Sequence, residues 1–375
     1  ISKRKSIALV SNNCWTKYRF RKGLIKTLLK SGYKVYVIAG KDKYHEKIEE
    51  IGAVYIEVPF NSSPLNLFSS LRYFIAILKI YRRYKFNLII HYTIVPNIFG
   101  STAAKLSGLS SISVITGLGH AFLSSRLLSY ISSKLYLFAL NKSKKVLFVN
   151  YDDRNYFVNN KIVSMDKTEV INVDVDVNYY VNYKSDNHKK IKDSFVFLMV
   201  SRIIAEKGIH EFIDAANSLH YKYPNFKFHL LGGFYEENPS SIDKKIIDGA
   251  VSAGVITYLG EHDDVRPFIS QSDCIVLPSY REAKGLALVE AGLMGKPLIA
   301  TNVPGCRDIV SHGYNGFLCE SKNAFDLSQK MLSMGQLLPE NLKQMSLNSE
   351  IKMLQEFNQN KTNSTYITLV QQIVD

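Results

Sequence analysis

The chain repeats one alternation of strands and helices in two successive passes, and this pattern restricts its fold more than any other feature. Short apolar runs such as 6–11, 34–40 and 86–93 alternate with stretches whose apolar residues recur at helical spacing. The alternation restarts at 194–202, after the polar segment 182–194. Strands that alternate with helices form parallel sheets covered on both faces. We therefore predict an α/β protein of two Rossmann-like, doubly wound domains.

The length of 375 residues exceeds the usual size of one domain, which also favours two. We expect an N-terminal domain over 1–185 and a C-terminal domain over 186–350. We expect a final helix over 351–375 to pack back toward the N-terminal domain. Because ligands of such sheets lie at the carboxyl ends of the strands, we expect the domains to face each other across a ligand-binding cleft.

Charge is distributed unevenly between the halves. Residues 1–185 contain 28 Lys and Arg against 11 Asp and Glu, whereas residues 186–375 contain 19 against 22. A cationic half favours a polyanionic partner: nucleic acid, anionic lipid or a pyrophosphate-bearing substrate. Solubility alone is the alternative interpretation of the total charge.

The four cysteines are scattered, without the spacing of a zinc site or a disulfide framework. No apolar run is long enough for a transmembrane helix, and the sequence begins without the apolar stretch of a signal peptide. These observations favour a cytoplasmic protein.

Two carboxylates, Glu282 and Glu290, flank the start of a predicted helix over 285–294. A helix N-terminus directed into a cleft offers free N–H groups to phosphate oxygens. A carboxylate just before that helix can accept hydrogen bonds from sugar hydroxyls. One two turns further along can bind a vicinal diol, such as that of a ribose.

The stretch that holds both carboxylates, SYREAKGLALVEAGLMGKPLIA, resembles the signature of retaining glycosyltransferase family 4 (group 1), which has the GT-B fold. The next stretch, TNVPGCRDIVSHGYNGFL, is similar to the same family. The chain looks closest to bacterial members that assemble O-antigen, capsule or N-glycan oligosaccharides on polyprenyl pyrophosphate. The resemblance implies transfer of an N-acetylhexosamine or hexose from a UDP-sugar to a polyprenyl-pyrophosphate-linked saccharide, with retention of configuration.

The same resemblance assigns site residues. In VSRIIAEKGIHEFIDAA it implies that Arg202 and Lys207 bind the donor diphosphate, so that no divalent metal or other cofactor is required beside the nucleotide sugar. Glu282 would orient the donor sugar, and Glu290 would bind the ribose. The other implied donor-binding residues are Ala283, Lys284, Gly285, Leu286 and Gly233.

Two departures from the family pattern accompany these assignments. The family has Glu-Gly where this chain has Glu282-Ala283, with Gly285 two positions further on. Relatives often have a Gly-Ser-Gly-Val-Asp turn where this chain has Asn172 and Asp174.

The first half supplies candidate acceptor residues after its strands. Asn12 and Asn13 occupy the first strand–helix turn. Gly117 and Gly119 form a later turn, and by resemblance the following His120 is a candidate catalytic residue beside the reacting sugar. His91 ends another strand. For both histidines a structural role is the open alternative.

Basic and large apolar residues interleave on the predicted helix over 66–85, which suits an anionic membrane surface. The membrane-facing residues predicted there are Arg72, Lys79, Arg82 and Arg83. Tyr130, Lys134, Tyr136 and Phe138 lie on a second candidate helix. We expect peripheral association with the inner face of the cytoplasmic membrane. A buried helix with a solvated edge is the alternative.

Three other functions are alternatives to glycosyl transfer. A nicotinamide-dependent oxidoreductase needs a Gly-x-Gly-x-x-Gly turn after the first strand, and SNNCWTK contains no glycine. A nucleotide-sugar 2-epimerase shares the two-domain fold but would not need a basic membrane-facing half. A non-enzymatic protein that binds membrane or nucleic acid would use the basic half, although no nucleic-acid recognition module is visible, so we expect no nucleic-acid partner.

Overall fold

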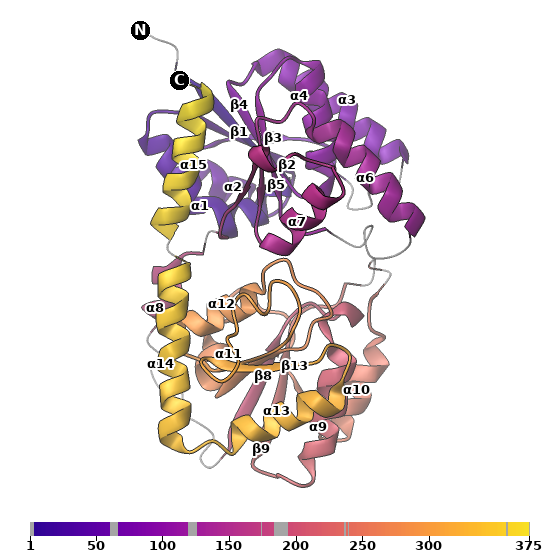
Figure 1. Cartoon of the computed structure of the whole chain (residues 1–375), viewed down its shortest axis with the longest axis vertical. Helices are drawn as coiled ribbons and strands as arrows, with labels where there is room; N and C mark the ends of the chain where they lie inside the picture. The colour runs from indigo at the N-terminus through magenta and orange to yellow at the C-terminus, as the bar shows by residue number, and fades with distance from the viewer. Residues whose placement is uncertain are drawn as a thin grey trace. The chain divides into compact units, whose positions relative to one another are not determined.

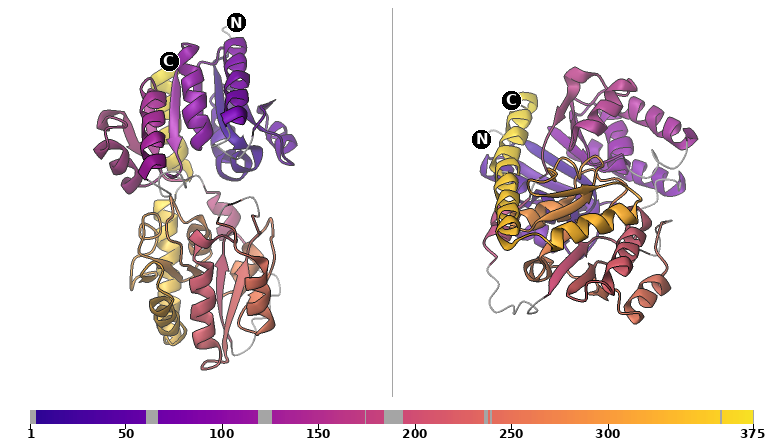
Figure 2. Two further views of the ribbon diagram at one scale, coloured as in Figure 1. Left: turned by 90° about the vertical axis from the view of Figure 1, so that its right-hand side faces the viewer. Right: turned by 60° about the horizontal axis from the view of Figure 1, so that its bottom comes forward.

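The chain forms two compact units in the computed structural model, which describes residues 4–60, 67–118, 126–173, 175–183, 194–235, 238, 240–357 and 359–374. Unit 1 comprises 1–176 together with 358–375, and unit 2 comprises 177–357. Each unit is a parallel sheet with helices on both faces (Figures 1 and 2). No helix within the described ranges is both long and apolar enough to cross a membrane.

In the part of unit 1 that is described, seven parallel strands form the sheet in the order β3-β2-β1-β4-β5-β6-β7. The strands are β1 Ser6–Asn13, β2 Lys34–Gly40, β3 Val54–Glu57, β4 Leu88–Tyr92, β5 Ser111–Ile115, β6 Lys145–Phe148 and β7 Thr168–Val170. The central strands are buried along almost their whole length. This burial on both faces explains their continuous apolar runs.

The helices of unit 1 are α1 Cys14–Lys30, α2 His45–Glu50, α3 Leu67–Tyr84, η1 Pro96–Gly100, α4 Ser101–Leu106, α6 Arg126–Leu140, α7 Tyr151–Asn159, η2 Met165–Lys167 and α15 Gln359–Val374. Helical spacing of the apolar residues predicts a first helix over 19–34, but the helix begins five residues earlier, at Cys14. The reason is a capping contact that periodicity does not reveal: the Asn13 side chain accepts a hydrogen bond from the Thr16 N–H at 3.0 Å.

Unit 2 repeats the design within the described residues, with six parallel strands in the order β10-β9-β8-β11-β12-β13. The strands are β8 Phe195–Val200, β9 Phe226–Leu231, β10 Thr257–Tyr258, β11 Cys274–Leu277, β12 Leu298–Thr301 and β13 Gly316–Cys319. The helices are α8 Val177–Val181, η3 Ala205–Lys207, α9 Ile209–His220, α10 Lys244–Ser252, α11 Arg266–Gln271, α12 Leu286–Leu293, α13 Ala324–Gly335 and α14 Pro339–Glu356. The sequence pattern predicts only helices after the strand at 297–301, and this prediction was wrong, because β13 follows that strand and pairs with β12.

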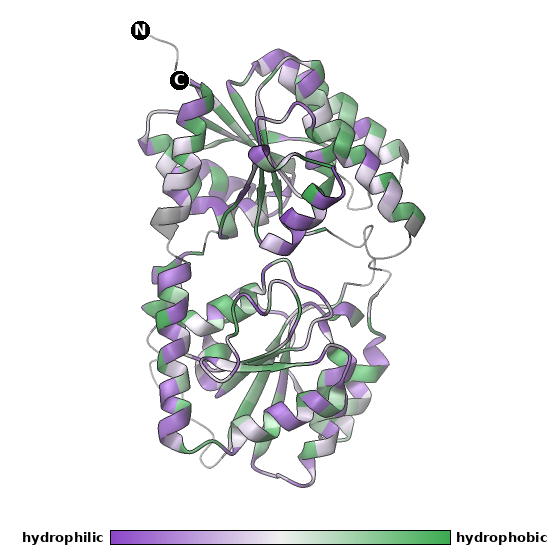
Figure 3. Cartoon of the chain, viewed as in Figure 1, coloured by the Kyte–Doolittle hydropathy of each residue, from purple (hydrophilic) through white to green (hydrophobic). Residues whose placement is uncertain are grey.

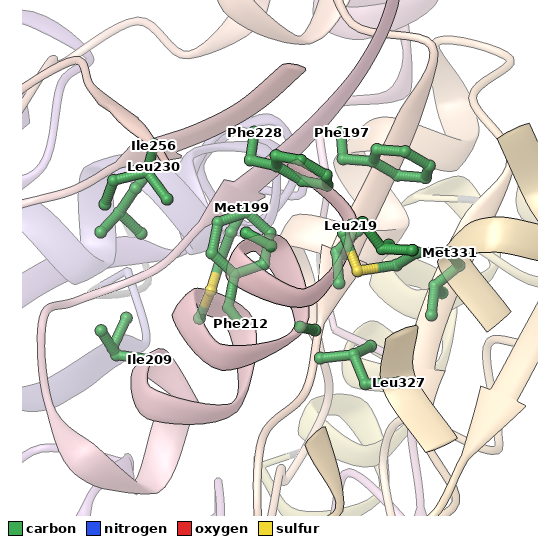
Figure 4. Packing of buried hydrophobic residues seen from close by; sticks show 14 of the residues in the cluster. Phe197, Met199, Ile209, Phe212, Leu219, Phe228, Leu230, Ile256, Leu327 and Met331 are labelled. Atoms are coloured by element: carbon green, nitrogen blue, oxygen red, sulfur yellow. The ribbon is translucent and has the colours of Figure 1, made fainter. Parts of the chain in front are cut away.

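The core of unit 2 lies between its central strands and the helices α9 and α13 (Figure 4). Phe197 and Phe228 are register partners on β8 and β9, and their rings stack with centroids 5.6 Å apart. Phe212 from α9 and Met331 from α13 belong to the same buried cluster. This packing holds β8 firmly, and β8 carries the loop from which the site is built.

Both sheets contain a topological switch point, where the strand order reverses direction. It lies between β1 and β4 in unit 1 and between β8 and β11 in unit 2. Chain segments that leave the carboxyl ends of two such strands diverge and leave room for a ligand. We therefore expect the ligand-binding residues of each unit at these strand ends.

The C-terminal helices divide between the units. The helix α14 belongs to unit 2, whereas α15 belongs to unit 1 and packs against α1. Tyr366, Leu369 and Val370 of α15 are buried in the same cluster as Leu24 and Leu28 of α1. The polar segment 182–194 has the composition of an interdomain linker. The first unit boundary lies before this segment, at 176/177, because α8 contacts α12 and so belongs to unit 2.

Candidate functional site

Opposite charges meet at the switch point of unit 2. Lys207 ends η3, in the connection that follows β8, and Glu282 lies in the loop that follows β11. The Lys207 ammonium contacts Oε1 of Glu282 in a salt bridge, and both side chains are mostly buried. The two residues are 75 positions apart in sequence, and the adjacency of β8 and β11 brings them together.

The loops that carry this pair are held tightly to each other. Gly208 has φ +78°, and a Cβ at this position would lie 2.1 Å from the carbonyl oxygen of Pro278. Tyr280 N–H donates to the Glu206 carbonyl at 2.8 Å, and its hydroxyl donates to the Glu211 carboxylate at 2.8 Å. Only glycine allows this close approach, and this explains on steric grounds why a glycine follows Lys207 in the sequence motif.

The Glu282 carboxylate has a second neighbour. The Ser279 hydroxyl donates to the same Oε1 at 3.0 Å. Both of these contacts use Oε1, and the carboxylate Oε2 has its own capacity to accept hydrogen bonds. Gly305, at φ +78°, lies against the backbone of Glu282 and Ala283 from the next loop and fixes its path.

Arg202 differs from Lys207 in its surroundings. It follows β8, its side chain is exposed, and its guanidinium lies over the Tyr235 ring at 5.4 Å from the centroid. Stacking on an aromatic ring orients the planar guanidinium while leaving its N–H groups at the edge. Arg202 is thus presented to solvent beside the more buried Lys207.

The start of α12 provides backbone donors near the pair. Gly285 is the N-cap residue, and within the described chain no side chain caps this end. Ala283 and Leu286 are half-buried, and Gly285 is buried against Leu277 and Leu288. The first N–H groups of a helix, together with its dipole, favour an anion at this position.

Lys284 was predicted to bind the donor, but its side chain is engaged elsewhere. Its ammonium lies 3.7 Å from an Asp308 oxygen and 5.4 Å from the Phe357 ring centroid. Burial lowers the pKa of Lys284, and the carboxylates of Asp308 and Glu356 partly oppose that shift. The side-chain contacts of Lys284 therefore do not support its predicted role in donor binding.

Gly233 follows β9 and lies beside Glu261. A Cβ at Gly233 would be 2.4 Å from a Glu261 carboxylate oxygen, so a larger residue would displace that side chain. The Gly233 carbonyl accepts from the Ile203 N–H at 2.9 Å, directly after Arg202. Gly233 thus supports the loop that carries Arg202.

Glu290 is buried on α12, and its partner was not predicted. The Tyr180 hydroxyl of α8 donates to Glu290 Oε1 at 2.5 Å. The helix α8 is itself anchored, because the Arg266 guanidinium stacks 3.5 Å from the Tyr179 ring centroid and donates to the Tyr179 carbonyl. The segment around 170–180 looked only like a departure from the family turn, and its tyrosines were the available signal.

The switch point of unit 1 pairs neutral side chains at its strand ends, and two buried cations of α1, Lys17 and Arg21, lie 3.3 and 5.0 Å from the centroid of the Tyr92 ring at the end of β4. The Thr93 hydroxyl, after β4, donates to the Asn12 side chain at the end of β1, and Thr93 has φ +67°. Asn13 is used as the cap of α1. Gly117 follows β5 with φ +136°, whereas Gly119, His120 and Asp174 lie outside the described residues.

His91 was a candidate for the acceptor site, but it lies in the interior of unit 1. Its side chain is completely buried, and its ring nitrogens contact the Tyr81 hydroxyl at 2.8 Å and the Ser101 hydroxyl at 3.1 Å. Burial lowers the pKa of His91 to about 3. These contacts favour the structural alternative, because a hidden and satisfied imidazole does not reach an acceptor.

The four basic residues predicted to face a membrane are all exposed on α3. They are Arg72, Lys79, Arg82 and Arg83. The opposite side of the helix is buried through Tyr73, Ile77 and Tyr81. The helix is thus neither fully buried nor fully solvated, and it presents a cationic edge.

Comparisons with known proteins agree with this geometry. A family described as "Glycosyl transferases group 1" matches residues 182–350, and one described as "Glycosyl transferase 4-like" matches residues 6–150. Together these cover both units.

Two similar curated proteins carry names that describe their reactions. The chain is 27% identical to the N,N'-diacetylbacillosaminyl-diphospho-undecaprenol alpha-1,3-N-acetylgalactosaminyltransferase of Campylobacter jejuni, over 84% of this chain and 85% of that protein. It is 26% identical to the UDP-Gal:alpha-D-GlcNAc-diphosphoundecaprenol alpha-1,3-galactosyltransferase of Escherichia coli, over 70% of each.

Among solved structures, HepE from Anabaena in complex with UDP and glucose has a TM-score of 0.80, at 18% identity over 98% of this chain and 100% of that one. A glycosyltransferase from Rickettsia africae has a TM-score of 0.77, at 20% identity over 100% and 99%. These likenesses establish the fold. The two family matches, over residues 6–150 and 182–350, show that the chain belongs to the group 1 glycosyltransferases, and the solved structures show that it has the GT-B fold.

Proposed function

We propose that the chain transfers a hexose or N-acetylhexosamine from a UDP-sugar to a saccharide linked to polyprenyl diphosphate, with retention of anomeric configuration and without a divalent metal. The observation that carries this proposal is the Lys207–Glu282 pair at the switch point of unit 2, beside the start of α12. The names of the two curated relatives support the class of acceptor, since both describe saccharides on diphospho-undecaprenol.

In this proposal the donor diphosphate takes Lys207 and Arg202 as partners. Its oxygens also face the first N–H groups of α12. The bond between the sugar anomeric carbon and the diphosphate oxygen breaks, and the cations stabilise the negative charge that develops on the departing UDP. Glu282 accepts from hydroxyls of the donor sugar and holds its ring in place.

The acceptor hydroxyl attacks the oxocarbenium-like carbon from the face that UDP leaves, and its proton passes to the departing phosphate. Retention follows, because the new bond forms on the same face as the old one. The protein contributes position and charge rather than a nucleophile. The products are the extended lipid-linked saccharide and UDP.

Association with the inner face of the cytoplasmic membrane belongs to the same proposal. A polyprenyl-linked acceptor is confined to the membrane, so the enzyme must reach that surface. The exposed cations of α3 support this association, because each Lys or Arg near an anionic surface contributes up to ~1 kcal/mol.

A panel of nucleotide sugars assayed with a polyprenyl-diphosphate-linked saccharide tests the proposal. We expect turnover with a UDP-sugar, undiminished in excess EDTA, and a product whose anomeric configuration by NMR equals that of the donor. Exclusive use of a guanosine- or adenosine-diphosphate sugar would contradict the donor assignment. Loss of turnover in EDTA with recovery in magnesium or manganese would contradict metal independence, and an inverted product would contradict retention.

A further inference from the structure

The helix α6 exposes an apolar face. Leu127, Tyr130 and Phe138 have 68%, 61% and 55% of their surface exposed. The complete set, here called the α6 face, is Leu127, Tyr130, Ile131, Leu135, Leu137 and Phe138, each more than 40% exposed. Figure 3 shows hydrophobic residues recurring along this helix. Exposed apolar residues gathered on one helix mark an interaction surface rather than random surface composition.

The water-exposed side of α6 is mainly apolar. The buried side of α6 carries Tyr136, Ala139 and Leu140 together with the half-buried Ser129, Ser132 and Ser133, whereas the exposed side, over the described side chains of 127–140, is apolar apart from Lys134. A surface helix of a soluble domain normally exposes charged and polar side chains to water. The α6 face is therefore built to contact something other than water.

Cations border the α6 face. The Lys105 ammonium of α4 lies 4.0 Å from the Phe138 ring centroid, and the Lys134 ammonium lies 5.2 Å from that of Tyr130. The surface continues over α4, where Leu106 is 57% exposed, and α4 contacts both α6 and α3. Long lysine side chains can keep their charge at an interface while their neighbours enter an apolar layer.

The charge of this region indicates the chemistry of the partner. Residues 58–151 contain no Asp or Glu, but they contain 11 Lys and Arg. Two copies of such a surface would repel each other, and so would most basic partners. A layer that is apolar inside and negative at its surface matches both properties of the α6 face at once.

We propose that the α6 face inserts into the headgroup and upper acyl region of an anionic lipid bilayer, while the basic residues of α3 and α4 contact the lipid phosphates. The inference deepens the proposed function, because it names how unit 1 would reach a lipid-linked acceptor. It differs from attraction by charge alone in one measurable respect: part of the binding survives high salt.

Vesicle co-sedimentation with two matched variants tests the proposal. The α6 variant carries Leu127→Ser, Ile131→Ser, Leu135→Ser and Phe138→Ser, and the α3 variant carries Arg72→Glu, Lys79→Glu, Arg82→Glu and Arg83→Glu. On vesicles of phosphatidylcholine with phosphatidylglycerol, we expect the α3 variant to lose the salt-sensitive part of binding. We expect the α6 variant to bind at least ~10-fold more weakly, even at ~1 M salt, where the Debye length is about 3 Å.

The opposite results overturn the proposal. They are unchanged binding of the α6 variant, or complete release of the unaltered protein by salt. Dimers that form with rising concentration and are abolished in the α6 variant, with vesicle binding unchanged, would assign the face to a second copy. Circular dichroism and thermal unfolding of both variants show whether each is folded.

A fluorescent probe gives a second measurement, which does not depend on a variant with four substitutions. Trp15 is the single tryptophan of the chain, so Trp15→Phe leaves a dark background. In that background, Tyr130→Trp should shift to the blue on vesicles and be quenched by brominated lipid. Tyr221→Trp, at a 76% exposed position of unit 2, is the control and should do neither. An unshifted, unquenched probe at position 130 would overturn insertion.

These measurements need neither donor nor acceptor, so they report on the α6 face even if the transferase proposal fails. Activity then connects the two. Transfer to a water-soluble acceptor should be equal in the α6 variant and the unaltered protein, and transfer to a lipid-linked acceptor in vesicles should fall at least ~10-fold. Failure of transfer in every protein, with lipid insertion intact, would refute the proposed function alone.

Discussion

The two switch points of this chain share a topology but differ in chemistry. In unit 2 the strand ends bring together Lys207 and Glu282, and the exposed Arg202 follows β8 with its guanidinium over the Tyr235 ring. In unit 1 they bring together Asn12 and Thr93, and the nearby His91 is buried within β4. The same reversal of strand order therefore creates the space for a ligand in each unit, and the residues after the strands decide the charge of that space. We propose that the anionic donor binds at unit 2, whereas the cations at the switch point of unit 1, Lys17 and Arg21, are buried against the Tyr92 ring.

The largest expected effect comes from removing a cation at the switch point of unit 2. Lys207→Ala and Arg202→Ala should each lower kcat about 10²-fold or more, the scale of losing one preorganised partner of a leaving group. Steady-state kinetics measures this. Lys330→Ala on α13, which removes a partly exposed lysine paired with Asp326, is the control and should retain activity. Equal activity of Lys207→Ala and the control would contradict a role for Lys207 in stabilising the leaving group, and with it the proposed difference between the two switch points.

A smaller effect should distinguish the interior histidine of unit 1. Burial lowers the pKa of His91 to about 3, below its ordinary value of about 6.5, so the folded state stays neutral while the unfolded state gains a proton. The stability that depends on this histidine is complete above about pH 6.5. It falls by up to ~1.4 kcal/mol per pH unit as the pH drops toward 3.

Chemical unfolding of His91→Gln between pH 7 and 5 measures this contribution. The unfolding free energy of the variant should depend less on pH than that of the unaltered protein, by up to ~2 kcal/mol at pH 5. His262→Gln, at an exposed position, is the control. Parallel pH profiles for His91→Gln and the unaltered protein would show that His91 is accessible to protons in the folded chain.

The smallest effect concerns the support of Glu290. Glu290→Ala should chiefly weaken donor binding, because ribose contacts stabilise the ground state and the transition state alike. Tyr180→Phe removes one hydrogen bond to that carboxylate and should raise the donor Kd about 10-fold, from ~1.5 kcal/mol for a bond to a charged group. Calorimetric titration with UDP measures both. Tyr221→Phe is the control, and an unchanged Kd in Glu290→Ala would refute the ribose assignment.

Local features of the chain were predictable because they depend on neighbouring residues. The apolar runs that form β1, β2, β4 and β8 are recognisable by their composition. Gly32 lies just past the end of α1 with φ +87°, and a glycine at this position is a sequence signal for the end of a helix. Boundaries were less accurate where a side chain decided them, as Asn13 does for α1. Short elements such as α2 and β7 were missed, since few residues carry their signal.

The sequence by itself determined the two passes of strand and helix, the spacing of Glu282 and Glu290, and the family to which these patterns belong. Only the tertiary structure decided which charges meet. Lys207 reaches Glu282 across 75 positions, Tyr180 reaches Glu290 across 110, and Lys284 is drawn to Asp308. The physical reason is that helical and strand periodicity are local properties, whereas these contacts depend on strand order and on which helix faces are buried. For the same reason, sequence alone left open whether His91 was a ligand contact and which side of α6 was exposed.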